Sequence, residues 1–220
     1  MKIYLVRHGE SEANVNLNIA KIKPDYNIAL TAKGKRQSKK TAKQLSKLLA
    51  ENGYLSDWAS MDNFNPPVVI WYGPYIRSRD TAEIISNNLF EYGDNNYPIQ
   101  HEKIEHLLIH ERKFGLFDGY SDEEARDKFP IEYQSYKKHK DMYDEFWVKI
   151  PFGESVADVA QRANQVLHDI KIHNIENKTE HHVIIGHSIF NRAFEIMYNR
   201  LHFNKYYDLK EQDNGEIKVL

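Results

Sequence analysis

Two histidines and one arginine lie at the ends of apolar runs that predict buried strands, and a second arginine follows another such run after a Gly-Pro turn. Arginine presents a planar fork of donors that stays charged, so two arginines can bind a dianion from two sides. A neutral imidazole can attack phosphorus to give a phosphohistidine, and a second imidazole can bind the phosphoryl oxygens. These four residues could therefore carry out phosphoryl transfer together. They are Arg7, His8, Arg77 and His187.

Release of an ester's alcohol also needs an acid that protonates the departing oxygen. Glu111, which opens the charged run 111–115, is the candidate for this acid. Each residue also has a simpler interpretation when taken alone: Arg77 could pair with Asp80, and Glu111 could pair with Lys113 on a surface. The joint occurrence of these side chains at predicted strand ends favours the catalytic interpretation.

The elements that must position these residues are strands alternating with helices. Such alternation predicts an α/β sheet that is mostly parallel, and ligands bind such sheets at the carboxyl ends of the strands. The turn signal at 213–215 predicts a hairpin between strands at 206–209 and 216–220. The other expected strands are 3–6, 68–72, 99–102 and 183–185, and the expected helices are 31–49, 76–89, 155–174 and 189–199.

The segment from about 104 to 150 has a different pattern, because it is rich in charged and aromatic residues and has no strong strand signal. Ser121 followed by Glu124 resembles a capping box, which predicts that a helix starts there. We predict a helical insertion over the active-site side of a single domain that covers residues 1–220. The aromatic residues of 133–147 are expected to pack in the core and the lid.

Composition narrows the function classes. Lys and Arg total 30 and Asp and Glu total 32, so a net charge of −2 gives no indication of a nucleic-acid or membrane partner. The chain has no cysteine, which excludes disulfides and thiolate catalysis. The apolar run at the N-terminus is too short for a signal peptide, so a cytoplasmic location is expected.

Two other kinds of site receive weaker support. The basic helix face over 33–47 lacks interleaved aromatic residues and is expected to face solvent, so no nucleic-acid partner is predicted. His106 and His110 have helical spacing, and His181 and His182 are adjacent, but carboxylate or cysteine ligands do not accompany them in a convincing pattern. We predict that these four are surface histidines and that the protein uses no metal.

Six segments in this order resemble motifs of the histidine phosphatase superfamily, the phosphoglycerate mutase-like proteins. Together they extend over nearly the whole chain, from residue 3 to about 200, which makes the resemblance specific. The segments are 5–14 (LVRHGESEAN), 30–37 (LTAKGKRQ), 73–82 (GPYIRSRDTA), 111–119 (ERKFGLFDG), 153–155 (GES) with Arg162, and 183–187 (VIIGH) with Arg192.

The resemblance implies a role for each site residue. His8 would accept the phosphoryl group, and Glu111 would first protonate the leaving group and later activate the attacking water. The implied fold is a three-layer α/β/α sandwich, and no metal or cofactor is implied. The residues expected to bind the phosphoryl oxygens are Arg7, Asn14, Arg77 and His187.

The chain departs from the family pattern at three positions. Ser188 stands where the family usually has Gly, Gly73 replaces a common Ser, and Phe114 replaces the Tyr common in mutases. We include Ser188 with Arg112 as candidate substrate-binding residues, because Ser188 follows His187 and because Arg112 or its neighbour could meet a substrate carboxylate.

The same chemistry serves a phosphatase, which gives the phosphoryl group to water, and a mutase, which returns it to another hydroxyl. Gly115 and Gly153 lie 38 positions apart, and so short an insertion resembles the phosphatase branch. We therefore predict a phosphomonoester hydrolase that acts on a phosphorylated small molecule. The alternatives are a phosphoglycerate mutase-type enzyme, which alone would need a 2,3-bisphosphoglycerate primer, and a non-catalytic phosphate-binding protein. The natural substrate and the oligomeric state stay open.

Overall fold

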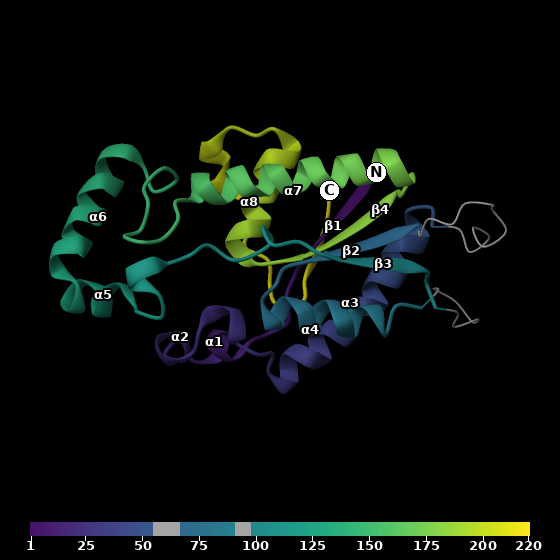
Figure 1. Ribbon diagram of the computed structural model, residues 1–220, viewed down its shortest axis with the longest axis horizontal. Coiled ribbons are helices and arrows are strands. Elements are labelled where there is room, and N and C mark those ends of the chain that lie inside the picture. The colour runs from purple at the N-terminus through teal and green to yellow at the C-terminus, as the bar shows by residue number, and fades with distance from the viewer. Residues whose placement is uncertain (55–66, 91–97) are drawn as a thin grey trace.

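The computed structural model describes residues 1–54, 67–90 and 98–220, which form a five-stranded sheet with helices on both faces (Figure 1). The strand order is β3-β2-β4-β1-β5. The four strands from β3 to β1 are parallel, and β5 runs antiparallel to β1 at one edge. The predicted, mostly parallel α/β sheet is confirmed. The strands are β1 (Lys2–Arg7), β2 (Val68–Tyr72), β3 (His101–Glu105), β4 (His181–Gly186) and β5 (Ile217–Val219).

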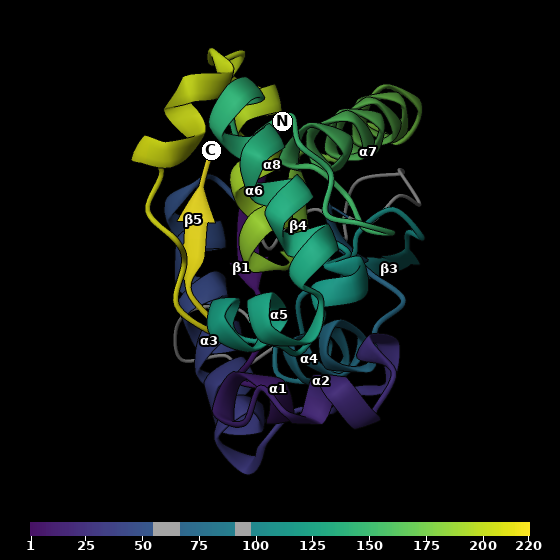
Figure 2. The ribbon, with the colours of Figure 1, turned by 90° about the vertical axis from the view of Figure 1, so that its left-hand side faces the viewer.

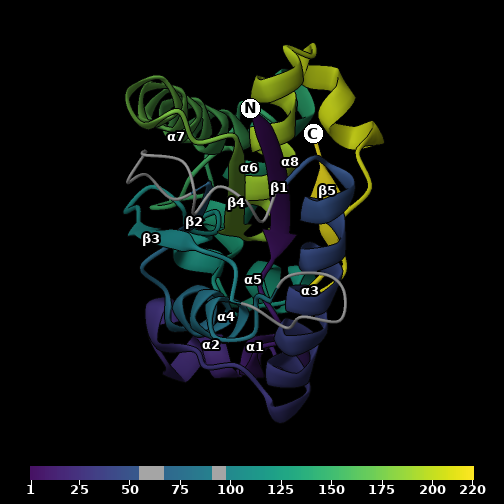
Figure 3. The same ribbon diagram turned by 90° about the vertical axis from the view of Figure 1, so that its right-hand side faces the viewer.

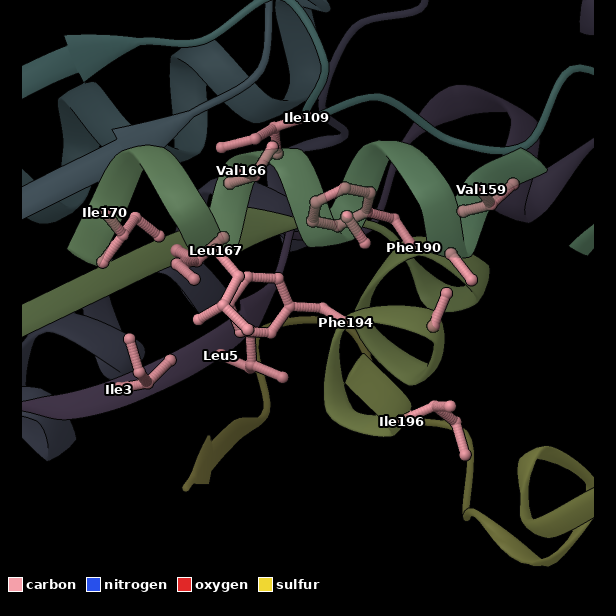
Figure 4. Close-up of a cluster of buried hydrophobic side chains, with 14 of the residues drawn as sticks. Ile3, Leu5, Ile109, Val159, Val166, Leu167, Ile170, Phe190, Phe194 and Ile196 are labelled. Carbon is pink, nitrogen blue, oxygen red and sulfur yellow. The ribbon is translucent and has the colours of Figure 1, made fainter. Parts of the chain in front are cut away.

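Two pairs of helices complete the three layers. Helices α3 (Ala32–Glu51) and α4 (Ile76–Ser86) cover one face of the sheet, and α7 (Val156–Asn177) and α8 (Ser188–Asn199) cover the other (Figures 1 and 3). Each face has its own apolar core. Figure 4 shows the core under α7 and α8, which contains Phe190 and Phe194 of α8 together with Ile3 and Leu5 of β1.

Strand β1 shows why the sheet needs helices on both faces. Ile3 and Leu5 pack in the core under α7 and α8, whereas Tyr4 and Val6 pack in the core under α3 and α4. Successive side chains of a strand point to opposite faces, so a continuous apolar run is buried on both sides. All four side chains are fully buried.

The helices begin where the sequence indicated. The Thr31 hydroxyl accepts a hydrogen bond from the Gly34 N–H at 3.0 Å and caps α3, and Ser155 accepts one from the Asp158 N–H at 3.1 Å and caps α7. The lysines of α3 face solvent as predicted. No helix in the described part of the chain is long and apolar enough to cross a membrane.

The helical insertion is confirmed, with different limits. Ser121 caps α5 (Asp122–Lys128), and α6 (Pro130–Tyr143) follows it (Figure 2). Residues 104 and 105 still belong to β3, and from there to α5 the chain is irregular apart from a short 3-10 turn, η3 (Gly115–Phe117). The segment made of α1 (Glu12–Val15), α2 (Ile19–Ile22) and the turn η1 (Asp25–Asn27) lies beside α5. An ion pair of 2.7 Å between Lys21 and Glu124 joins the two.

The predicted hairpin near the C-terminus is wrong. Residues 206–209 are not a strand, because the chain forms a 3-10 helix, η4 (Phe203–Asp208), and β5 pairs with β1 instead. Tyr206 explains the difference, since its ring is buried against Phe146 and the Arg192 guanidinium. Burial of this aromatic side chain, rather than strand pairing, fixes the backbone there.

Two smaller predictions also need correction. The third strand is β3 at 101–105 rather than 99–102, because Ile99 turns into the core before the strand begins. The histidines were expected on the surface, but His181 and His182 lie in β4 and are buried, and His110 is also buried. His106 and His110 are not on a helix, and His106 pairs with Asp169 at 2.9 Å.

Candidate active site

The two predicted histidines meet because their strands are neighbours. Parallel pairing aligns Arg7 of β1 with Gly186 of β4, and the His8 N–H donates to the Gly186 carbonyl at 3.1 Å. The residues that directly follow these strands are His8 and His187, and their ring centroids are 4.9 Å apart. Two side chains 179 positions apart in the sequence thus occupy one site at the carboxyl ends of the strands.

His8 is held as a neutral base with one defined free nitrogen. Its Nδ1 lies 2.7 Å from the Gly9 carbonyl oxygen, which can only accept, so Nδ1 carries the proton and Nε2 keeps its lone pair. Burial, together with the positive charges of Arg77 and Arg7, lowers the pKa of His8 to about 3. His8 is therefore neutral at any ordinary working pH, as a nucleophile must be.

Several buried polar atoms around His8 have no partner among the residues that the structure describes. Both ring nitrogens of His187, which is fully buried, and Nε of Arg7 belong to this group. Burial lowers the pKa of His187 well below its usual value, with a further contribution from Arg77. Unpaired buried polar groups are rare in folded proteins. This set suits a ligand with several oxygen acceptors.

Arg77 reaches the site from the first turn of α4. Two hydroxyls hold this helix against the sheet: Ser78 donates to the Ile185 carbonyl at 2.8 Å, and Thr81 accepts from the Gly9 N–H at 3.1 Å. Gly73, where the family often has Ser, is required by a close crossing. A Cβ there would lie 1.6 Å from the Ile109 carbonyl oxygen, so the chain that carries Glu111 passes directly over it.

Arg77 pairs with Asp25, not with Asp80. Its Nη1 lies 2.8 Å from Asp25 Oδ1 and donates to the Asp25 carbonyl oxygen at 2.7 Å. Both contacts use the same guanidinium nitrogen, so Asp25 fixes one edge of Arg77. The sequence gave no indication that Asp25 belongs to the site.

Glu111 lines the same cavity as His8, and its carboxyl group is held at both oxygens. Oε1 accepts from the Arg112 N–H at 2.8 Å, and Oε2 accepts from the Ile189 N–H at the start of α8 at 3.3 Å. Loss of water around the carboxyl raises its pKa, although these two hydrogen bonds act in the opposite direction. A carboxylic acid that holds its proton more tightly than usual is suited to general-acid catalysis.

Arg162 fixes the chain that carries Glu111. Its Nη1 donates to the carbonyls of Leu108 and His110, at 2.8 and 2.7 Å, and Nη2 donates to the Glu111 carbonyl at 3.2 Å. Its remaining two N–H groups bind the Glu154 carboxylate at 3.0 and 3.1 Å. All five guanidinium donors are used, and the side chain is only 9% exposed.

The two predicted substrate-binding residues do not line the active-site cavity. Arg112 Nε donates to the Glu154 carbonyl at 2.8 Å, and its Nη1 lies 3.8 Å from Glu145. Ser188 is the first residue of α8, is buried, and has an unpartnered hydroxyl. Both remain predictions as substrate ligands. Lys113, the other cation considered, is exposed and also lies outside the cavity wall.

The cavity beside His8 has a volume of about 370 Å³ and two unlike ends. His8, Arg7, Arg77 and Glu111 line its inner end. Its outer end lies between the 11–25 and 114–120 segments, which bring Asp25 and Asp118 to the wall together with apolar and aromatic side chains. The larger apolar and aromatic side chains of this wall are Leu17, Phe114, Phe117 and Tyr120. The sequence gave Asp118 no role beyond its place in the 111–119 motif.

Asn14 also lines the cavity, as the sequence predicted, and a residue from the C-terminus supports it. The Asn14 Oδ1 accepts from the Ser11 N–H at 2.9 Å and from the Asn214 Nδ2 at 3.2 Å. Asn214 also donates to the His8 carbonyl at 3.1 Å. The turn signal at 213–215 gave no indication of this contact, because it depends on β5 lying beside β1.

No group of three or more histidine, cysteine or carboxylate side chains within the described residues could hold a metal ion. The site that the structure assembles consists of imidazole, guanidinium and carboxyl groups. Such groups can bind a phosphoryl dianion, attack phosphorus and transfer a proton. The fold and this site define an α/β protein of the phosphoryl-transfer class.

Comparison with known proteins gives the family. The model of the histidine phosphatase superfamily, branch 1, matches residues 3–61 and 58–220. The chain belongs to this superfamily, so the prediction made from the motifs is confirmed. Solved structures of phosphatases share the fold: a mycobacterial glucosyl-3-phosphoglycerate phosphatase complexed with VO3 has a TM-score of 0.68 at 16% identity, covering 99% of this chain and 90% of its own.

Other similar proteins are phosphatases and mutase-like proteins. The phosphoglycerate mutase-like protein AT74 of Arabidopsis thaliana is 26% identical over the whole chain, which spans 64% of the length of that relative. The broad-range acid phosphatase DET1 of Saccharomyces cerevisiae is 21% identical, over 99% of this chain and 84% of its own. The phosphoserine phosphatase of Entamoeba histolytica, in complex with 3-phosphoglyceric acid, is 22% identical with a TM-score of 0.62, covering 99% of this chain and 89% of its own.

Proposed function

We propose that the protein hydrolyses phosphomonoesters through a phosphohistidine on His8, with Glu111 as general acid and base. The observation that carries the proposal is the pairing of a neutral His8, whose Nε2 lone pair is free, with a carboxyl group of raised pKa in the same cavity. The neutral nucleophile and the carboxyl group that holds its proton more tightly than usual match the opposite protonation requirements of the two roles.

The first step forms a bond between His8 Nε2 and phosphorus and breaks the bond from phosphorus to the ester oxygen. Arg77 and Arg7 balance the charge on the phosphoryl oxygens, and His187 supplies a further polar contact. Glu111 gives its proton to the departing alcohol. In the second step Glu111 takes a proton from water, the hydroxide oxygen attacks phosphorus, and the bond to His8 breaks.

The cavity favours hydrolysis over mutase chemistry. A mutase must clamp the carboxylate of its phosphoglycerate with a cation, and Arg112 was the candidate. Arg112 instead donates through Nε to the Glu154 carbonyl and lies near Glu145. Its Nη2 is buried without a partner among the described residues, and the side chain does not line the cavity. Among the described residues that line the cavity, Arg7 and Arg77 are the only cations, and both belong to the phosphoryl end.

Phosphate release from a panel of esters tests the proposal, with His8→Ala as the matched variant. The panel contains p-nitrophenyl phosphate, glycerol 1-phosphate and 3-phosphoglycerate, assayed in the presence of a chelator. We expect turnover by the wild type, at least about 10⁴-fold less in His8→Ala, and acid-labile phosphate on the wild type alone.

Three outcomes would contradict the proposal. Turnover retained in His8→Ala would remove His8 as the nucleophile. No release from any ester, followed by interconversion of phosphoglycerates in the presence of a bisphosphoglycerate primer, would establish the mutase alternative. A protein that binds esters but neither hydrolyses nor interconverts them would be the non-catalytic alternative.

A further inference from the structure

The side chains at the outer end of the cavity would contact the leaving alcohol of a substrate, which the catalytic residues do not select. An alcohol attached to a phosphoryl group at His8 must extend toward this end, because the buried, paired strands β1 and β4 occupy the space behind His8. The side chains there decide which alcohols fit. They comprise two carboxylates and an apolar wall with three aromatic rings.

The two carboxylates are differently engaged. Asp25 is bound to Arg77 through one guanidinium nitrogen, and its side chain is 30% exposed. Asp118 is half-buried, and no side chain among the described residues donates a hydrogen bond to it. Burial and the negative charge of Asp25 raise the pKa of Asp118, and the charge of Arg77 and the Gly119 N–H offset this only in part. A donor placed beside Asp118 would offset both effects.

The cations near this end are already occupied. Lys21 pairs with Glu124 at 2.7 Å, and Lys128 hydrogen-bonds to the Tyr120 hydroxyl. Both ammonium groups lie over the Tyr120 ring, at 4.7 and 4.5 Å from its centroid, and neither residue lines the cavity. A carboxylate on the leaving group would therefore meet Asp118 and Asp25 without a free cation to pair with.

We infer that Asp118, supported by Asp25, selects phosphomonoesters whose leaving alcohol carries hydroxyl or ammonium donors, and rejects those that carry a carboxylate. This inference rests on the proposed hydrolase function and names the substrate class of the same site. A hydroxyl or ammonium group donates to the Asp118 carboxylate, whereas a carboxylate is repelled by it. Carbon atoms of the alcohol pack against Phe117 and Leu17.

Three esters of similar size test the inference: O-phosphoethanolamine, glycerol 1-phosphate and 2-phosphoglycolate, whose leaving groups are cationic, neutral and anionic. We expect the wild-type kcat/KM for the first two to exceed that for phosphoglycolate by about tenfold or more. In Asp118→Asn the ratio of phosphoethanolamine to phosphoglycolate should fall by about tenfold, because one partly screened charge contact is lost. Asp127→Asn, on the exposed face of α5, is the matched control and should leave the ratio unchanged.

A wild type that prefers phosphoglycolate, or an Asp118→Asn ratio equal to the wild-type ratio, would overturn the inference. Failure of the hydrolase proposal gives a different result, namely no turnover of any ester. In that case the affinities of the same esters for His8→Ala, measured by calorimetry, test the selection by Asp118, since this variant keeps Asp118. A preserved ranking supports the selection by Asp118 without catalysis, and a reversed or flat ranking rejects it.

Discussion

The inner and outer ends of the cavity are built in different ways. The inner end stands on buried strands, where His8 and His187 are 4% and 0% exposed and sheet register sets their separation. The outer end stands on short helices and turns around 11–25 and 114–120, where Asp25 and Asp118 keep contact with solvent. We infer from this difference that the sheet positions the catalytic side chains, whereas the connecting segments provide the side chains that select the substrate.

Among the changes considered, replacement of Glu111 at the inner end should cause the largest loss of kcat/KM. Glu111→Gln removes the acid, so kcat/KM for an alkyl phosphate should fall by about 10²- to 10⁴-fold, whereas p-nitrophenyl phosphate, whose leaving group needs no proton, should be slowed far less. Steady-state kinetics on both esters measures this. Glu105→Gln, on the exposed edge of β3, is the control. Equal slowing of both esters would reassign the acid.

The pH dependence gives an independent measure of the same group. Because the pKa of Glu111 is raised, its acid form persists above the usual carboxyl range, and activity on the alkyl ester should fall as pH rises through that raised pKa. His8 stays neutral down to about pH 3, so its protonation adds no loss in mildly acidic solution. A Glu111→Gln profile that keeps the same alkaline decline would mean that another group causes it.

A smaller effect is expected from Arg162, which does not touch the cavity but positions Glu111. Arg162→Met frees the carbonyls of residues 108, 110 and 111, so the alkyl phosphate should lose about tenfold more kcat/KM than the aryl phosphate. A merely structural loss would slow both esters alike, since it lowers the amount of folded enzyme. Arg162→Lys, which restores one charge without the fork, should recover part of the loss, and Arg126→Met on α5 should show none.

The smallest effect on catalysis is expected from a change in β4, the strand that precedes His187. His182 is fully buried in β4, accepts from the Trp71 indole at 3.1 Å, and lies 3.1 Å from the Thr179 carbonyl oxygen. Burial lowers its pKa to about 4. The unfolded chain, with a pKa of about 6.5 at this residue, binds the proton more readily, so stability should decrease as pH falls from about 6.5 to about 4.

Urea unfolding at several pH values measures this loss, which we expect to be on the order of 3 kcal/mol for a shift of this size. In His182→Gln the free energy of unfolding should vary less over the same range, since the titrating group is gone. His202→Gln, which changes an exposed histidine, is the control. An unchanged pH dependence in His182→Gln would show that other groups set the acid limit.

Local sequence patterns predicted most of the inner end. The apolar runs at 3–6 and 183–185 can only be buried strands flanked on both faces, and caps at Thr31, Ser121 and Ser155 mark helix starts through hydrogen bonds within three residues. These signals act over short distances, so they can be recognised without the fold. The C-terminal hairpin failed because Tyr206 is fixed by partners far away in the sequence, Phe146 and Arg192.

By itself the sequence determined which residues can do the chemistry, because the types of His8, His187, Arg77 and Glu111 and their places after apolar runs are properties of the chain alone. Tertiary structure decided how these residues are charged and which neighbours they have. Burial lowers the pKa of His8 and raises the pKa of Glu111, and the crossing of distant segments brings Asp25 to Arg77 and Asp118 to the cavity wall. Desolvation and Coulomb interactions depend on distances in space, which sequence separation does not give.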